Sequence, residues 1–165
     1  RDTLKKYRGF LEATLMYQEL HPYISSPLKR LVKSPKGYLI NNGLLSFLSD
    51  IYNLDILKKT GQVGHRLENW VLREWQTALD RHPEKSAVYF WRTSGGVEVD
   101  LIVQRGKNII PIEITHAEKP DPKKMRHLQQ FMEEEKVQIG FYIYNGPFQY
   151  NPNTHIIFFP LWALD

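Results

Sequence analysis

Residues 97–103 and 108–115 form two neighbouring strand-like segments with carboxylates set among apolar side chains. In the first segment apolar residues alternate with Glu98 and Asp100, and in the second isoleucines alternate with positions that include Glu113. Successive side chains of a strand point to opposite faces, so each strand is expected to bury one face and to carry its carboxylates on the other. The pattern predicts a β-sheet with at least one covered face.

The flanking sequence alternates between helical and strand-like patterns. Apolar side chains recur at helical spacing in residues 63–78, and residues 122–135 form a second predicted helix. Further strands are predicted over residues 87–92, 137–144 and 155–160. This order predicts an α/β fold in which helices sandwich a mixed β-sheet.

The first part of the chain is predicted to be organised differently. A helix capped by Asp2 should extend to about Leu20, and the short basic segment 29–33 follows it. A strand over residues 38–40 and a helix over residues 43–51 come next. A helix followed by a two-stranded wing is one arrangement that fits this order.

Charge is distributed unevenly between the two parts. Residues 1–66 hold 11 basic and 5 acidic side chains, whereas residues 67–165 hold 11 basic and 13 acidic ones. A basic first part suggests an anionic partner such as nucleic acid, although such an excess is also common as solubilising surface charge.

The chain contains no cysteine, which excludes a disulfide scaffold, a thiolate zinc site and a cysteine nucleophile.

Three carboxylates are candidates for one metal site. Glu68 lies in the first long helix, and Asp100 and Glu113 lie in adjacent strands, so the three could meet at one end of the sheet. Carboxylates and a backbone carbonyl, here that of Ile114, are suitable ligands for Mg²⁺ or Mn²⁺, and a bound metal can orient a water against a phosphodiester. The alternative is that Asp100 and Glu113 point to solvent from a half-exposed sheet.

The same residues carry a family resemblance. Glu68, Asp100 at the end of Glu-Val-Asp, and Glu113-Ile114-Thr115 resemble the core of the PD-(D/E)XK nuclease superfamily. Residues 64–115 are also similar to the uncharacterised domain that follows the ATPase module in many prokaryotic AAA+ family ATPases. The matching motifs are Gly64-x-x-Leu67-Glu68-Asn69-x-Val71, Tyr89-Phe90-Trp91-Arg92-Thr93, Gly96-x-Glu98-Val99-Asp100, Pro111-Ile112-Glu113 and, upstream, Ser34-Pro35-Lys36-Gly37-Tyr38.

The resemblance implies a division into two domains. Residues 62–165 would form a nuclease-like domain with a restriction-endonuclease-like core. Residues 1–58 would be a partial winged-helix-like α+β segment, because residues 3–12 resemble the last helix of the family's winged-helix portion. Independently of the resemblance, residues 53–64 are predicted to be a connector, because they contain two glycines and the pair Lys58-Lys59.

One departure from the nuclease pattern bears on activity. The pattern has lysine two residues after the second carboxylate, where this chain has Thr115, and loss of one preorganised electrostatic donor typically costs about two to three orders of magnitude in rate. Cations that could substitute are Lys119, Lys123, Lys124, Arg126 and Arg92. The alternative for each is an ordinary surface charge.

The sequence contains no phosphate-binding loop motif, so we expect no ATP site in this chain. Gly106-Lys107 lacks the glycine five residues earlier, and Asn108 replaces the Ser or Thr of a phosphate-binding loop. The resemblance implies a longer parent protein with an N-terminal ATPase module, and any ATP hydrolysis would take place there. The longest apolar run, residues 156–164, is too short to span a membrane, and we expect a cytoplasmic protein without a membrane partner.

Two functions remain open from the sequence. The first is a nucleic-acid-binding or protein-binding regulatory module of an AAA+ type ATPase, with a degenerate nuclease-like site. The alternative is an Mg²⁺-dependent DNA or RNA nuclease in which a displaced basic residue replaces the missing lysine.

Overall fold

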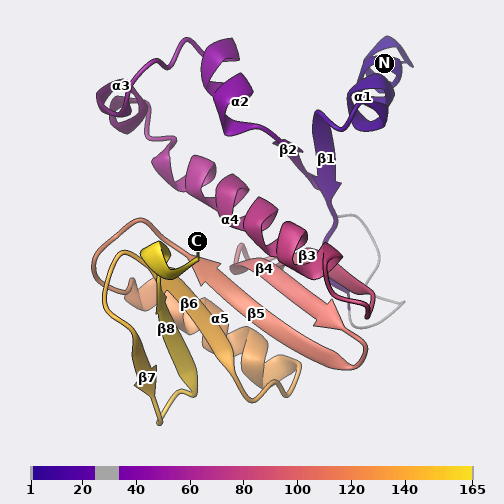
Figure 1. Cartoon of the computed structure of the whole chain (residues 1–165). Coiled ribbons are helices and arrows are strands. Elements are labelled where there is room, and N and C mark those ends of the chain that lie inside the picture. Colours follow the sequence, from indigo (N-terminus) through magenta and orange to yellow (C-terminus); the bar gives the residue numbers. More distant parts are fainter. Residues whose placement is uncertain (1, 25–33, 165) are drawn as a thin grey trace.

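The computed structural model describes residues 2–24 and 34–164 as a mixed α/β arrangement (Figure 1). The basic segment predicted at residues 29–33 lies outside the described residues. In chain order, the elements are α1 (Asp2–Ala13), β1 (Tyr17–Leu20), β2 (Lys36–Leu39), α2 (Asn42–Leu48), α3 (Leu54–Lys59), α4 (Val63–Asp80), β3 (Ser86–Arg92), β4 (Glu98–Arg105), β5 (Asn108–Ile114), α5 (Pro122–Glu134), β6 (Gly140–Tyr144), β7 (Gln149–Asn151), β8 (Ile156–Pro160) and the short 3₁₀ helix η2 (Leu161–Ala163).

A six-stranded mixed sheet forms the centre of the molecule. Its strand order is β3-β4-β5-β6-β8-β7. Strands β3, β4 and β5 pair antiparallel, with Gly96 at a φ of 82° in the β3–β4 turn, a conformation that suits glycine. The connection from β5 passes through α5 and returns to β6, which pairs parallel to β5. The predicted mixed sheet is confirmed, and β7 is a short strand that the sequence pattern did not predict.

Helices cover both faces of this sheet, as predicted. Val71 and Leu72 of α4 pack in one buried cluster with Leu101 and Ile112 of the sheet. On the other side, the apolar face of α5 packs against side chains of β4, β6 and β8 in a second cluster. The residues of this second cluster that are buried are Trp91, Val99, Ile102, Leu128, Phe131, Met132, Tyr142, Tyr144, Ile156 and Phe158.

The N-terminal part differs from the prediction in two places. The first helix ends at Ala13 rather than near Leu20, because Leu15 adopts a positive φ of 57° and the chain then enters β1. The segment predicted as a connector contains α3, whose first turn is capped by the side chain of Asn53 accepting from the backbone N–H of Ile56.

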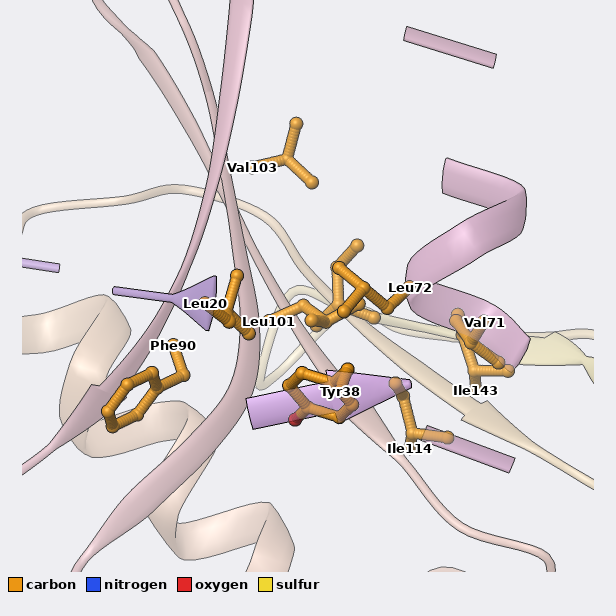
Figure 2. Close-up of a cluster of buried hydrophobic side chains, with 10 residues drawn as sticks. Leu20, Tyr38, Val71, Leu72, Phe90, Leu101, Val103, Ile114 and Ile143 are labelled. Atoms are coloured by element: carbon orange, nitrogen blue, oxygen red, sulfur yellow. The ribbon is translucent and has the colours of Figure 1, made fainter. Parts of the chain in front are cut away.

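Strands β1 and β2 form a separate antiparallel pair whose side chains enter the main core. Leu20 of β1 and Tyr38 of β2 lie among residues of α4 and the large sheet in the first cluster (Figure 2). The boundary predicted near residue 60 therefore separates segments of the chain that share one buried cluster. Helix α1 contributes nothing to it, since none of its residues is buried.

No helix in the described part of the chain is at once long enough and apolar enough to cross a bilayer.

Candidate functional site

Asp100 and Glu113 lie side by side at the face of the sheet covered by α5. Asp100 comes from β4 and Glu113 from the adjacent β5, and they are 9% and 1% exposed. The Oδ2 atom of Asp100 accepts a hydrogen bond of 2.9 Å from the backbone N–H of Ile114, which ties the two strands together at this point. The alternative in which both carboxylates point to solvent is therefore wrong.

A lysine ammonium lies between these carboxylates. Nζ of Lys124 is 2.8 Å from Oδ2 of Asp100, 3.1 Å from Oε2 of Glu113 and 2.7 Å from the carbonyl oxygen of Ile114. An ammonium has three N–H donors, so these three oxygens use its full donor capacity. Lys124 is one of the cations predicted from the sequence as a possible substitute for the missing lysine, and in the structure its ammonium lies at the predicted site.

The start of α5 is held in a position that directs Lys124 inward. Asp121 caps the helix by accepting 2.7 Å from the backbone N–H of Lys123, and Pro122 occupies the first turn, where its missing N–H costs nothing. The backbone N–H of Asp121 in turn donates to the hydroxyl of Tyr142 at 2.9 Å. Buried Tyr142 of β6 therefore fixes the helix start on the sheet, and no motif in the sequence marked it for this role.

The two carboxyl groups have opposite pKa shifts. Burial and then the negative charge of Asp100 raise the pKa of Glu113 well above its ordinary value. Burial, the largest single effect, would also raise the pKa of Asp100, but the charge of Lys124, side-chain hydrogen bonding and the charge of Lys36 together outweigh it, and the pKa of Asp100 is lowered. Burial lowers the pKa of Lys124, but Asp100 and Glu113 raise it above its ordinary value, so the ammonium stays charged at neutral pH.

Glu68 makes its contacts elsewhere, with residues of β2. Its Oε1 atom accepts from Nζ of Lys36 at 2.8 Å and from the hydroxyl of Tyr38. Within residues 2–24 and 34–164 there is no group of three His, Cys, Asp or Glu side chains placed to hold a metal ion. The structure thus unites Asp100, Glu113 and the carbonyl of Ile114, and pairs Glu68 with a lysine.

Thr115 does not act as a substitute for the missing lysine. Its hydroxyl accepts a hydrogen bond of 3.3 Å from the backbone N–H of Ala117, at the start of the loop that leads to α5. None of the other candidate cations forms an ion pair with Asp100 or Glu113 among the described residues. Lys119, Lys123 and Arg126 are exposed, and Arg92 pairs with Glu98 at 2.5 Å.

The site opens into a small cleft of about 280 Å³. Its lining residues are Glu98, Asp100, Glu113, Asp121, Lys123, Lys124 and His127. A larger cavity of about 610 Å³ lies near the opposite end of α5, beside Met132, Val137 and His155, and contains none of the predicted site residues.

The oxygens at this site are of the kind that Mg²⁺ prefers, but they do not fit a divalent ion while Lys124 is in place. One oxygen of each carboxylate and the carbonyl of Ile114 already accept from the ammonium. The remaining Oε1 atom of Glu113 is buried and has no hydrogen-bond partner among the described residues. Together with Oδ1 of Asp100, this leaves two carboxylate oxygens that the ammonium does not engage. A divalent cation, which takes six or more oxygen ligands, would have to bind them beside the positive charge of the ammonium, which repels it.

Lys36 and Tyr38 are the site residues whose role the sequence did not reveal. Both belong to the motif Ser34-Pro35-Lys36-Gly37-Tyr38, which matched the family pattern without an assigned function. The alternation in β2 places them on the same face, since they are two positions apart. That spacing was the available signal, but it could not show that this face meets Glu68.

Comparison with known proteins gives a family but no activity. Residues 63–164 match the model described as "Domain of unknown function (DUF4143)". Two uncharacterised proteins, from Mycobacterium bovis and Mycobacterium tuberculosis, are each 30% identical to this chain over 118 residues. The match covers 72% of this chain but 26% of each relative, so the chain spans about a quarter of the length of these curated relatives.

No solved structure matches the chain. The family match covers more than half of the sequence and includes Glu68, Asp100, Glu113 and Lys124. The chain therefore belongs to the DUF4143 family of domains of unknown function.

Proposed function

We propose that this chain is a nucleic-acid-binding regulatory module that does not cut its ligand, from the C-terminal region of a cytoplasmic AAA+ type ATPase. The observation that carries the proposal is the position of Lys124, whose ammonium donates to Asp100, Glu113 and the carbonyl of Ile114. In this proposal the lysine takes the place that a divalent metal takes in a PD-(D/E)XK nuclease.

The absence of cleavage follows from how the ammonium is used. Phosphodiester hydrolysis needs a group that activates water and a cation that stabilises the charge developing on the phosphate. All three donors of Lys124 are engaged by the protein, and Thr115 stands where the nuclease pattern has its lysine. Neither residue is then available to a phosphate.

Support for a nucleic-acid ligand comes from the edge of the cleft. Lys119, Lys123 and Arg126 are exposed in the loop before α5 and in the first turns of that helix. Exposed basic side chains and the amide end of a helix attract phosphate groups. The basic first part of the chain gives less support than its composition suggested, because Lys36 and Arg66 are largely buried and contact protein groups.

The topology supports a nuclease-like core in residues 62–165. A β-hairpin, β4–β5, presents the two carboxylates, and a crossover through α5 leads to the parallel strand β6. A winged-helix-like assignment for residues 1–58 has support in the order of α1 and the antiparallel pair β1–β2.

The proposal includes contact with the N-terminal ATPase module of the parent protein. Helix α1 has no buried residue, and its apolar side chains Leu4, Tyr7 and Phe10 are each more than 60% exposed. Exposure of these apolar side chains to water is unfavourable, and contact with a partner surface would bury them.

A metal-dependent nuclease is the second candidate, favoured by one observation. The fold returns a lysine from α5 to the carboxylates, which is what a displaced catalytic cation requires. For this function Lys124 would have to leave its three acceptors when Mg²⁺ enters, and then bind the phosphate.

Incubation of supercoiled plasmid with pure protein and Mn²⁺ separates the two candidates. The binding module leaves the plasmid intact, while a titration with labelled DNA shows binding that weakens steeply with added salt, as phosphate contacts require. Plasmid cleavage that disappears in Asp100→Ala would establish the nuclease instead. Absence of DNA binding at low salt would contradict a nucleic-acid ligand.

A further inference from the structure

A second lysine lies between two carboxylates next to the site. Nζ of Lys36 is 2.8 Å from Oε1 of Glu68 and 2.5 Å from Oε1 of Glu98. The Lys36 ammonium also lies 5.1 Å from the centre of the Phe90 ring, a cation–π distance. Its side chain is 17% exposed, and those of Glu68 and Glu98 are 16% and 25% exposed.

Glu98 connects this lysine to the cleft. It lines the cleft together with Asp100, which lies two residues further along β4. The other oxygen of Glu98 accepts from Nε and Nη2 of Arg92, at 2.6 and 2.5 Å. The charge of Lys36 contributes to the lowered pKa of Asp100, after the larger effect of Lys124.

Lys36 comes from outside the residues that match the family model. Strand β2 is held against α4 by buried polar contacts: Nδ2 of Asn69 donates to the carbonyl of Leu39 at 2.7 Å, and Tyr38 donates to Glu68. These contacts fix the position of strand β2, and with it the position of the Lys36 ammonium.

We propose that Lys36 is a positioning residue of the cleft, which together with Arg92 balances the charge of Glu68 and Glu98 and so admits a phosphodiester while excluding divalent cations. The inference rests on the proposed function and names a residue on which ligand choice depends. Together, Lys36 and Lys124 give each pair of carboxylates an internal cation, one pair being Glu68 and Glu98 and the other Asp100 and Glu113.

The charge balance explains the expected selectivity. Removing the ammonium of Lys36 leaves Glu68 without its cation and Glu98 with Arg92 alone, in a partly buried region where charges are weakly screened. The excess negative charge that remains beside the cleft attracts a divalent cation and repels a phosphate. The same substitution should thus move the two affinities in opposite directions, which a loss of folded structure cannot do.

The test uses Lys36→Met, with Lys58→Met as the matched control because Lys58 is exposed on α3. Free Mn²⁺ is followed by electron paramagnetic resonance, and binding of a short labelled DNA duplex by fluorescence anisotropy. Lys36→Met is expected to bind Mn²⁺ about tenfold more tightly and DNA about tenfold more weakly than the wild type. Lys58→Met should change Mn²⁺ affinity by less than about twofold.

A variant that restores the charge balance tests whether misfolding causes the changes in affinity. Lys36→Met combined with Glu98→Gln removes one positive and one negative charge, and both affinities are expected to return toward the wild-type values. Lys36→Arg, which keeps the charge, should resemble the wild type in both assays.

Unchanged Mn²⁺ affinity in folded Lys36→Met would overturn the inference, and so would a loss of DNA binding that Glu98→Gln does not reverse. If the wild type binds no DNA, the proposed function fails, but the Mn²⁺ measurements still decide whether Lys36 excludes divalent cations.

Discussion

Nζ of Lys124 donates a 2.8 Å hydrogen bond to Oδ2 of Asp100, across a separation of 24 residues in the chain. The same oxygen accepts from the backbone N–H of Ile114, so one carboxylate joins β4, β5 and α5 at a single point. The contact makes Lys124 part of the structure of the site, whatever ligand the cleft takes. Its removal should therefore affect both stability and metal binding.

Lys124→Met is expected to lower the free energy of unfolding by roughly 2 to 4 kcal/mol, because Asp100 and Glu113 lose their buried cation. The Lys124 side chain is 32% exposed, so water can solvate the carboxylates in part, and this favours the lower end of the range. Urea denaturation measures the change, with Lys123→Met, one position earlier and exposed, as the control. A loss in Lys124→Met no larger than that in Lys123→Met would contradict the role given to this ion pair.

Mn²⁺ should partly repair the same variant. With the ammonium gone, the two carboxylates and the carbonyl of Ile114 become free to bind a cation, and a ligand that binds only the folded state raises its stability. Thermal unfolding of Lys124→Met is expected to shift upward with millimolar Mn²⁺, while the wild type stays unchanged. An equal shift in both proteins would show that Lys124 does not keep the metal out.

Glu113→Gln should change the pH dependence of stability in a defined direction. A carboxyl whose pKa is raised in the folded state contributes stability that is complete below its unfolded pKa of about 4.3 and is lost as pH rises through the folded pKa. The variant lacks this loss. Its free energy of unfolding relative to the wild type should therefore increase as pH rises from about 4 upward. Urea denaturation at a series of pH values checks this, and a difference that is constant or falls with pH would contradict it.

Tyr38→Phe tests the attachment of β2 to α4. The buried hydroxyl of Tyr38 donates to Glu68, and burial followed by the charge of Glu68 raises the pKa of Tyr38. Its removal is expected to cost about 1 to 2 kcal/mol, typical of a hydrogen bond to a charged group. Tyr52→Phe is the control, since exposed Tyr52 donates to Asp50 at 2.7 Å and its loss should cost less than about 0.5 kcal/mol. Equal small changes in the two variants would show that Tyr38 does not anchor β2.

The central sheet could be predicted because its residues follow a simple physical rule. Alternating isoleucines in β5 and the helical spacing in α4 reflect burial of one face, and both elements occur where the pattern places them. The first helix was predicted too long because apolar residues at helical spacing continue past Ala13, where the backbone turns through a positive φ at Leu15.

The site was predicted less completely, for a different reason. The sequence placed Asp100 and Glu113 on neighbouring strands, and their meeting follows from strand pairing. The partner of Glu68 does not follow from strand pairing. It depends on how β2 packs across α4, and the two residues in contact are 32 positions apart in the chain. The choice of Lys124 among several nearby cations likewise depends on the rotation of α5, which Tyr142 and the Asp121 cap determine.

The most direct measurement of the central claim is nuclear magnetic resonance of the lysine ammonium groups as Mg²⁺ is added to the wild-type protein. The signal of Lys124 is identified as the one missing from Lys124→Met. An ammonium that donates to three oxygens exchanges slowly with water, and we predict that its signal is present and unchanged at millimolar Mg²⁺. Loss or displacement of that signal by Mg²⁺ would show that a metal replaces the lysine, and would contradict the proposal that Lys124 holds the place of the metal.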